Sequence, residues 1–183
     1  MNARPGHPRV PSTSRPLRRW ILAGCAAIAL LLTAQTRFGC VLVVGDSMLP
    51  SLRNGDLLLV RKHAYQDHAP SRGDVVVARF RRELVIKRIV GLPGEQIEVA
   101  HGTVCVNGTA LPEPWPVLHG PLDVLPGHLA ANRYAILGDN RSGSEFILFY
   151  AVMPPERLAG QAILALRWRW SEWNVWNPRR TDS

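Results

Sequence analysis

The pattern of apolar and polar positions divides the chain into three parts. Residues 1–19 are rich in Pro, Ser and Arg and show no apolar periodicity, which is typical of a flexible tail. Residues 20–36 form an uncharged, mainly apolar run. From residue 37 onward, short runs rich in Val, Ile and Leu alternate with Gly-containing turns. The sequence therefore predicts a tail, one apolar segment and a mainly β domain over residues 37–183.

Turn signals delimit the predicted strands of the third part. Asn54-Gly55 and Asn107-Gly108 are dipeptides that favour turns, and the alternating segment 96–108 turns at His101-Gly102, which predicts a hairpin. Residues 109–132 contain five prolines and are predicted to form a loop. No long amphipathic helix is predicted after the apolar run. The predicted strands are residues 41–44, 56–60, 74–80, 84–90, 96–100, 103–106 and 134–137.

The apolar run at residues 20–36 reaches the lower length limit of a membrane-spanning helix, which is about 17 residues. Five Arg and no acidic residue precede it, so the positive-inside rule predicts a cytoplasmic N-terminus and an extracytoplasmic domain. A cleaved signal peptide is the alternative, because an apolar core of about 7–15 residues is typical of such peptides. No small-x-small site stands cleanly at the end of the run, which favours the anchor. We therefore predict a single-pass protein of the plasma membrane.

The charge distribution follows the same division. The chain has 22 basic and 14 acidic residues, which gives a net charge of +8. Six of the basic residues stand at or before Arg37, and the first acidic residue is Asp46. Subtracting those six leaves 16 basic residues against 14 acidic ones in residues 38–183. Because nucleic-acid binding requires a basic face on the folded domain, this near balance argues against a nucleic-acid partner.

Cysteine and histidine residues show no pattern of a metal site. The three cysteines are Cys25, Cys40 and Cys105, and no C-x-x-C pair is present. Cys40 and Cys105 are able to pair outside the cytoplasm, but nothing in the sequence requires it. His63 and His68 flank a polar loop and are predicted to be solvated. We predict neither a metal site nor a cofactor.

Lysine is rare in this chain, since 20 of the 22 basic residues are Arg and only Lys62 and Lys87 are Lys. A buried lysine can lose its proton, whereas an arginine does not. Lys87 lies beside Arg88 in an apolar run, and strand alternation is expected to point one of these two side chains inward. Apolar surroundings lower the pKa of a lysine, which suits a general base. A surface lysine on an edge strand is the alternative, and this segment alone favours it.

Ser47 stands at a predicted turn that follows an apolar strand and contains Gly45. Such a turn can expose both a hydroxyl and its own backbone N–H, which combines a nucleophile with an oxyanion donor. An ordinary turn serine is the alternative. A third segment, residues 136–144, contains Gly-Asp-Asn after a strand, which by itself indicates only a tight turn.

In this order, the segments resemble the sequence boxes of the signal peptidase I family. The serine box reads Gly-Asp-Ser-Met-Leu-Pro-Ser-Leu, and the lysine box reads Ile-Lys-Arg-Ile-Val-Gly-Leu-Pro-Gly-Glu. The resemblance covers about residues 20–165. The matching boxes are residues 45–52, 55–60, 73–76, 86–95, 107–108 and 138–141.

The resemblance implies a β-barrel or sheet catalytic domain, outside the cytoplasm, with one N-terminal transmembrane helix. It implies a serine endopeptidase that removes signal peptides from exported precursor proteins after small residues, without metal or cofactor. By position, Ser47 is the nucleophile and its backbone N–H serves the oxyanion hole, Lys87 is the general base, and Ser144 orients the lysine. The resemblance also implies a pocket for a small residue, formed by Val43, Leu52 and Ile86. It further implies structural positions near the site, which are Met48, Pro50, Gly138, Asp139, Asn140 and Arg141.

The segment after Ser144 departs from the family pattern. The family usually has an Asp and an Arg there that look structural, and Phe146 and Leu148 stand in their places. Well-packed apolar residues often replace a buried ion pair at little cost in stability.

A tryptophan-rich run near the C-terminus predicts contact with membrane lipid, because Trp is favoured at membrane interfaces. An edge strand that packs these side chains into the core is the alternative. The four residues are Trp168, Trp170, Trp173 and Trp176.

Three other functions remain open at this point. One is a peptidase of the same family with a single dedicated substrate. Another is a self-cleaving Ser–Lys protein like the repressors of the SOS response, although those carry a DNA-binding domain where this chain has a tail and an apolar run. The third is a catalytically impaired, membrane-tethered binding module.

Overall fold

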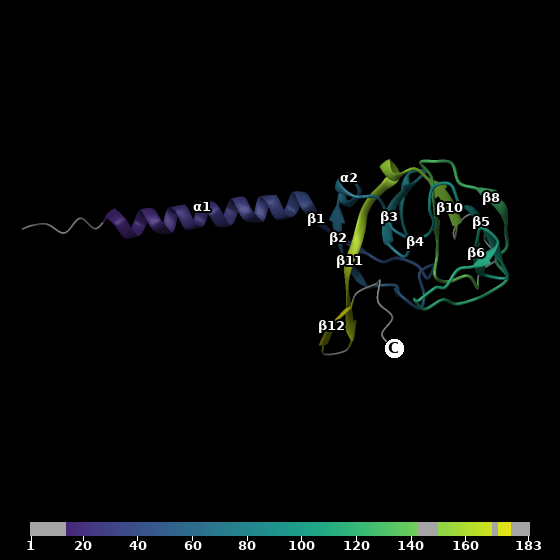
Figure 1. Cartoon of the computed structure of the whole chain (residues 1–183). Helices are drawn as coiled ribbons and strands as arrows, with labels where there is room; N and C mark the ends of the chain where they lie inside the picture. Colours follow the sequence, from purple (N-terminus) through teal and green to yellow (C-terminus); the bar gives the residue numbers. More distant parts are fainter. Residues whose placement is uncertain (1–13, 143–149, 170–171, 177–183) are drawn as a thin grey trace, which may run out of the picture. The chain divides into compact units, whose positions relative to one another are not determined.

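The computed structural model describes residues 14–142, 150–169 and 172–176 (Figure 1). The chain divides into two compact units, residues 1–36 and residues 37–183. Residues 1–13 of the predicted tail lie outside the described residues.

The first unit contains the helix α1, Ser14–Arg37, which begins six residues before the predicted anchor. Its segment Arg18–Arg37 has a mean hydropathy of 1.4, and none of its residues is buried within the structure. Twenty residues of helix extend about 30 Å, the thickness of the hydrocarbon layer of a bilayer. By length and composition α1 is therefore able to cross a membrane, although a signal sequence passes the same test.

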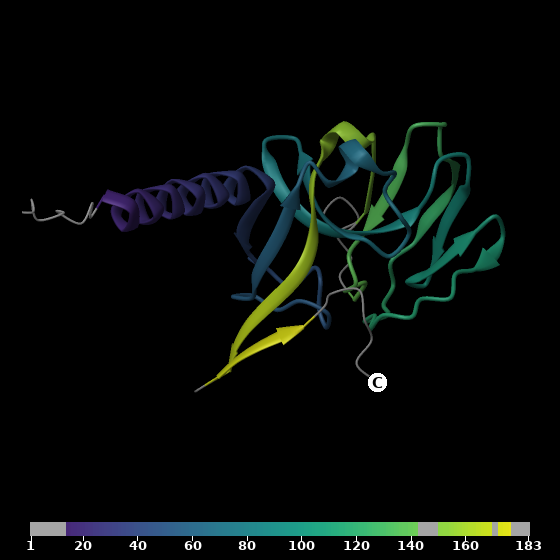
Figure 2. The same ribbon diagram turned by 60° about the vertical axis from the view of Figure 1, so that its left-hand side comes forward.

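The second unit is built from two antiparallel sheets (Figures 1 and 2). The larger sheet has the strand order β1-β2-β11-β3-β4-β9-β10, with β12 paired to β11, and the smaller sheet has the order β7-β6-β5-β8. The strands of the larger sheet are β1 Phe38–Leu42, β2 Leu57–Lys62, β3 Val75–Phe80, β4 Glu83–Gly91, β9 Tyr134–Leu137, β10 Tyr150–Met153, β11 Leu158–Arg169 and β12 Glu172–Trp176. The smaller sheet contains β5 Gln96–Ala100, β6 Thr103–Val106, β7 Thr109–Ala110 and β8 Val124–His128. Two short helices complete the unit, α2 Ala64–Asp67 and η1 Pro155–Arg157.

The prediction of a mainly β fold with an apolar N-terminal helix is confirmed. The hairpin between β5 and β6 turns where it was predicted, because His101 (φ 48°) and Gly102 (φ 76°) both adopt the left-handed conformation that such a tight turn requires. The prediction of an unbroken loop over residues 109–132 is wrong, since β7 and β8 lie within it. β8 contains Pro126 and Gly127, which are uncommon inside strands, and it is mostly exposed. Its sequence therefore lacks the alternation of apolar residues that usually predicts a strand.

Both faces of β4 are covered by apolar side chains. Ile86 packs against a cluster that contains Val43 and Leu52, whereas Ile89 belongs to a second cluster on the opposite face. Lys87 is therefore 6% exposed and Arg88 is 0% exposed. The predicted alternation sends the two side chains to opposite faces, but both of them are buried, because apolar side chains pack on both faces of the strand.

All three cysteines are free. Cys25 and Cys40 are exposed and Cys105 is partly buried. Cys40 lies on β1 of the larger sheet and Cys105 on β6 of the smaller one, so the structure contains no disulfide between them.

Candidate active site

Ser47 lies in the loop that connects β1 to β2. The Val43 N–H donates to the Asp56 carbonyl oxygen at 2.8 Å and closes the base of this loop. Within it, the Leu52 N–H donates to the Met48 carbonyl oxygen at 2.8 Å, which forms a single helical turn. The side chains of Met48 and Leu52 are buried in the same apolar cluster as Val43. Because the residues around it are anchored in the core, Ser47 is held half-buried at the rim of the loop.

The side chains of Ser47 and Lys87 meet, although 40 residues separate them in the sequence. Lys87 Nζ lies 2.6 Å from Ser47 Oγ and forms a hydrogen bond with it. Lys87 projects from β4, where its neighbour across the sheet is Val76 on β3, a fully buried residue. A hydroxyl and an amine at this distance are within reach of direct proton transfer.

Burial lowers the pKa of Lys87 from 10.5 to about 8. The main cause is desolvation, since the ammonium form loses its hydration shell among apolar neighbours. The negative charge of Asp139 acts in the opposite direction and raises this pKa. The lysine therefore deprotonates much closer to neutral pH than an exposed lysine does.

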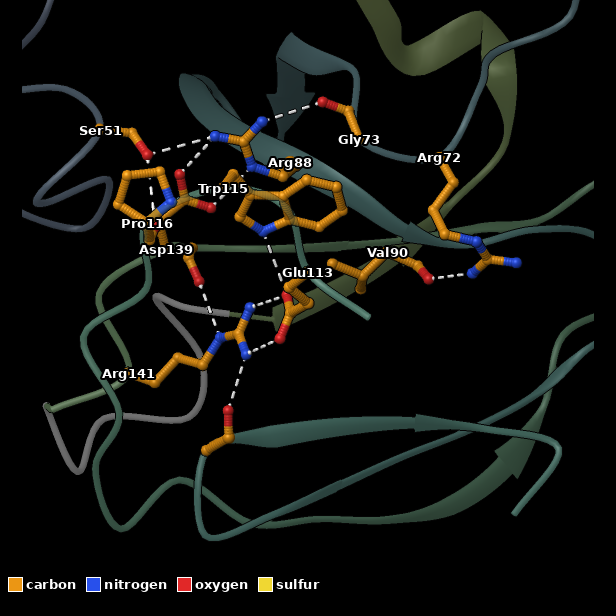
Figure 3. A network of polar contacts seen from close by, with 12 residues as sticks. Ser51, Arg72, Gly73, Arg88, Val90, Glu113, Trp115, Pro116, Asp139 and Arg141 are labelled. Atoms are coloured by element: carbon orange, nitrogen blue, oxygen red, sulfur yellow. Dashed lines mark hydrogen bonds and ion pairs between the residues drawn. The ribbon is translucent and has the colours of Figure 1, made fainter. Parts of the chain in front are cut away.

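Arg88, the next residue on β4, forms a fully satisfied ion pair on the other face (Figure 3). Its Nε donates to Asp139 Oδ1 at 2.9 Å and its Nη2 donates to Asp139 Oδ2 at 2.6 Å. Further donations reach the Gly73 carbonyl oxygen at 3.0 Å and Ser51 Oγ at 3.3 Å. The guanidinium also lies over the Trp115 ring, 4.7 Å from its centroid.

A second buried ion pair joins Arg141 to Glu113 (Figure 3). Arg141 Nη1 and Nη2 donate to the two Glu113 carboxylate oxygens at 2.6 and 2.5 Å. Trp115 Nε1 donates to the same carboxylate at 3.1 Å, so this ion pair and the Arg88 ion pair are connected through one indole ring. Sequence reasoning missed Glu113 and Trp115, which lie in the proline-rich segment predicted as loop and carry no local signal of their role.

The turn that carries Asp139 also holds the backbone of Ser47. The Asn140 N–H donates to the Ser47 carbonyl oxygen at 3.1 Å, and Asn140 Nδ2 donates to the Asp46 carbonyl oxygen at 3.0 Å. The Leu118 N–H donates to the Asp139 carbonyl oxygen at 2.9 Å, which fastens the turn to the chain that follows Trp115. The serine loop, the lysine strand and the Gly-Asp-Asn-Arg turn are thus one connected unit.

The three positions predicted to form a small-residue pocket lie together. Val43 and Leu52 belong to one buried cluster, and Ile86 packs against it from β4. On the opposite face of β4, Lys87 lines a hollow of about 550 Å³ with Val85 and Ile136. Lys87 is therefore adjacent to open space as well as to Ser47.

Several predicted residues have no described side chain. Ser144, Phe146, Leu148 and Trp170 lie outside the described residues. The backbones of Trp168, Trp173 and Trp176 belong to the antiparallel pair β11–β12, and the structure describes no more of these residues. Within the described ranges, no three His, Cys, Asp or Glu side chains lie close enough to bind a metal ion.

Comparison with known proteins places the chain in a family. The family described as signal peptidase, peptidase S26, matches residues 17–168. The signal peptidase I of Leptolyngbya laminosa is 31% identical over 171 residues, which cover 84% of this chain and 81% of that protein. The probable signal peptidase I-1 of Synechocystis is 32% identical over 166 residues, covering 81% and 82%. A signal peptidase I structure from Enterococcus faecalis shares 24% identity, with a TM-score of 0.41, and covers 50% of this chain and 95% of that one.

The fold and the comparisons define a serine endopeptidase with an apolar N-terminal helix. The chain belongs to the signal peptidase family, peptidase S26. The family processes signal peptides and is membrane-bound, and the length and composition of α1 agree with membrane attachment. The predicted resemblance to signal peptidase I is thereby confirmed.

Proposed function

We propose that this protein removes signal peptides from exported precursor proteins, with Ser47 as the nucleophile and Lys87 as the general base. The observation that carries the proposal is the 2.6 Å hydrogen bond between Ser47 Oγ and the buried Lys87 Nζ. A serine hydroxyl is a weak nucleophile until an adjacent base accepts its proton. A lysine whose pKa has fallen to about 8 is such a base.

The reaction has two steps, and in each step Lys87 accepts one proton and then donates it. Neutral Lys87 takes the proton of Ser47 Oγ as the oxygen attacks the carbonyl carbon of the scissile peptide, and the resulting ammonium then protonates the leaving amine. Lys87 next accepts a proton from a water molecule as the water attacks the acyl ester, and the ammonium returns this proton to Ser47 Oγ as the ester bond breaks. The backbone N–H of Ser47 donates to the oxyanion in both steps.

The free edge of β4 supports binding of an extended peptide. β4 pairs with β3 along residues 83–88, whereas its pairing with β9 begins at Arg88. In the described part of the chain, residues 83–87 therefore have one edge without a partner strand, to which a peptide can add. The side chain before the cut would lie against the cluster that contains Val43, Leu52 and Ile86, and a shallow pocket there would reject large residues.

The remaining parts of the proposal come from the family pattern. Ser144 would orient Lys87 by a hydrogen bond, so Ser144→Ala is expected to lower the rate of cleavage. Helix α1 would anchor the chain in the plasma membrane with the N-terminus in the cytoplasm and the catalytic domain outside. The tryptophan side chains of the C-terminal run would contact membrane lipid.

The test is cleavage of a precursor peptide with Ala at the positions three and one residues before the cut. Detergent-solubilised wild-type protein is compared with Ser47→Ala, Lys87→Ala and the control Ser71→Ala, which replaces an exposed hydroxyl. We expect both site variants to lose at least about 10³-fold in kcat/KM, because a nucleophile and its base act as a unit. The control keeps its activity. For the wild type, kcat/KM rises as the pH passes through about 8 and levels off above, since only neutral Lys87 is a base.

Two results would count against the proposal. Full activity in Ser47→Ala would exclude this serine as the nucleophile. A folded wild type that cleaves none of several precursors would favour a peptidase with one dedicated substrate, or a binding module.

A further inference from the structure

A basic hollow lies at the end of β4 that is remote from Ser47. Its volume is about 450 Å³, and its apolar floor includes Val41, Val77 and Leu84. Three exposed arginines at the hairpin between β3 and β4 also line it, namely Arg79, Arg81 and Arg82, which are together called the arginine rim. The hollow therefore combines apolar side chains with exposed positive charges.

The hollow borders the apolar cluster that contains Val43, because Val41 and Val77 line the hollow and also belong to or pack against that cluster. Val41 stands two residues before Val43, and Leu84 stands two residues before Ile86, so each pair shares a face of the extended chain. Val77 lies in the same apolar cluster as Val43. Apolar side chains thus lead from Val43 and Ile86 to the arginines of the hollow.

The charge on this rim is mostly uncompensated. Arg79, Arg81 and Arg82 are exposed, and none of them forms an ion pair within the described part of the chain. Arg81 lies over the ring of its neighbour Phe80, 5.6 Å from the centroid. Lys62 also lines the hollow, and Glu83 is the one acidic residue among its lining residues. The excess of positive charge favours an anionic occupant.

From the proposed function, we infer that this hollow binds an acidic side chain of the precursor, about five residues before the cut. β4 beyond Lys87 is covered by β9, so a peptide that pairs with the free edge extends from Lys87 toward Glu83. If the residue before the cut lies beside Ile86, alternation places the third residue before the cut beside Leu84, and the fifth then reaches the turn that carries Arg82. Four residues of strand span about 13 Å, at roughly 3.3 Å each. A lipid phosphate would match the charge, but continuity with the cleavage pocket favours the precursor.

The experiment compares two precursor peptides that differ only in Glu or Gln at the fifth position before the cut. We expect the detergent-solubilised wild type to cleave the Glu peptide with a kcat/KM about 3- to 10-fold higher at low salt, as for a partly exposed charge contact. The preference decreases in 0.5 M NaCl because the charges are screened. The Arg79→Gln/Arg81→Gln/Arg82→Gln variant cleaves both peptides equally. Arg157→Gln, which removes an exposed arginine outside the rim, keeps the preference.

A charge exchange distinguishes a direct contact from a general field. Arg82→Glu is expected to cleave a Lys peptide faster than the Glu peptide, with the change mainly in KM because the contact exists before and during the reaction. Equal cleavage of the Glu and Gln peptides by the wild type at low salt would overturn the inference. So would a preference that survives in the triple variant, one that appears for residues after the cut instead, or one that requires vesicles of anionic phosphatidylglycerol. Failure of the proposed function is a different result, because then no peptide is cleaved at all.

Discussion

Lys87 and Arg88 are adjacent on β4 and both are buried, but the two faces of the strand offer them different hydrogen-bond and charge partners. Arg88 faces a carboxylate that binds it with two hydrogen bonds, together with a backbone carbonyl, a hydroxyl and an indole ring. Lys87 donates to the neutral hydroxyl of Ser47, and Asp139 influences it without a direct ion pair. Two cations with similar burial therefore differ in whether a carboxylate binds them directly.

This difference explains why one position suits catalysis and the other suits structure. A buried cation with a bonded carboxylate keeps its charge and holds two segments together. A buried cation without one has its charged form disfavoured, and its pKa falls. Arg does not deprotonate in proteins, so only the lysine can convert this loss of solvation into basicity.

The largest expected effect comes from making the two positions alike. Lys87→Arg keeps the positive charge and a hydrogen bond to Ser47 but removes the ability to accept a proton. We expect kcat/KM for a precursor peptide to fall at least about 10³-fold at pH 8, as for loss of a catalytic base. The reverse exchange, Arg88→Lys, is expected to reduce stability and leave the folded fraction active. Cleavage by Lys87→Arg at a wild-type rate would show that Lys87 acts only as a charge.

Removing the carboxylate tests the structural side of the strand. Asp139→Asn leaves Arg88 buried without a counter-charge, which is expected to lower the free energy of unfolding by about 3–5 kcal/mol. Chemical denaturation of the solubilised chain measures this change. The control is Asp123→Asn, since that carboxylate is 62% exposed and its loss is expected to change stability by no more than about 0.5 kcal/mol.

The variant Asp139→Asn also tests the effect of this carboxylate on the pKa of Lys87. Asp139 raises the pKa of Lys87, so its removal is expected to lower that pKa below about 8. The rise of kcat/KM with pH in the folded fraction then moves to lower pH. A midpoint that does not move would mean that Asp139 acts on Arg88 alone. The double variant Arg88→Met/Asp139→Leu is expected to recover part of the stability, because no buried charge is left unpaired.

Replacing the lysine with an apolar side chain is expected to stabilise the protein. The pKa of Lys87 in the folded state is about 8, below the unfolded value of 10.5, so keeping it charged opposes folding at neutral pH. Lys87→Met is expected to raise the free energy of unfolding by up to about 3 kcal/mol at pH 7, at 1.36 kcal/mol per pKa unit. The wild type gains stability between pH 8 and 10.5, and the advantage of the variant disappears above that range.

Denaturation curves of the wild type and Lys87→Met at pH 7 and pH 10.5 measure this difference. Lys62→Met serves as the control because Lys62 is exposed. A lower stability for Lys87→Met at pH 7 would mean that the hydrogen bond to Ser47 contributes more than the desolvation of the ammonium.

The sequence predicted the residues of one side of β4 better than those of the other. Ser47 and Lys87 were named because their segments, in order, resemble the serine and lysine boxes of the family, whereas each segment alone left an ordinary surface residue open. Asp139, which pairs with Arg88, was predicted as a structural position near the site. Trp115, which stacks on Arg88, and Glu113, which pairs with Arg141, were not predicted, because they reach the site only through the folding of a proline-rich segment with no periodic pattern. The burial of Lys87 and Arg88 together also depends on both faces of the sheet being covered, which alternation along one strand cannot reveal.

The smallest expected effect concerns the indole that connects the two ion pairs. Trp115 is 8% exposed, stacks on Arg88 and donates to Glu113. Trp115→Phe keeps an aromatic face but loses the donor, so we expect a decrease of about 1 kcal/mol in the free energy of unfolding. Trp20→Phe, in the exposed helix α1, is the matched control with no expected change. If Trp115 serves only the arginine side of β4, the pH at which kcat/KM rises stays at the wild-type value while stability falls. A shift of that midpoint in Trp115→Phe would instead show that the ion-pair network sets the pKa of Lys87.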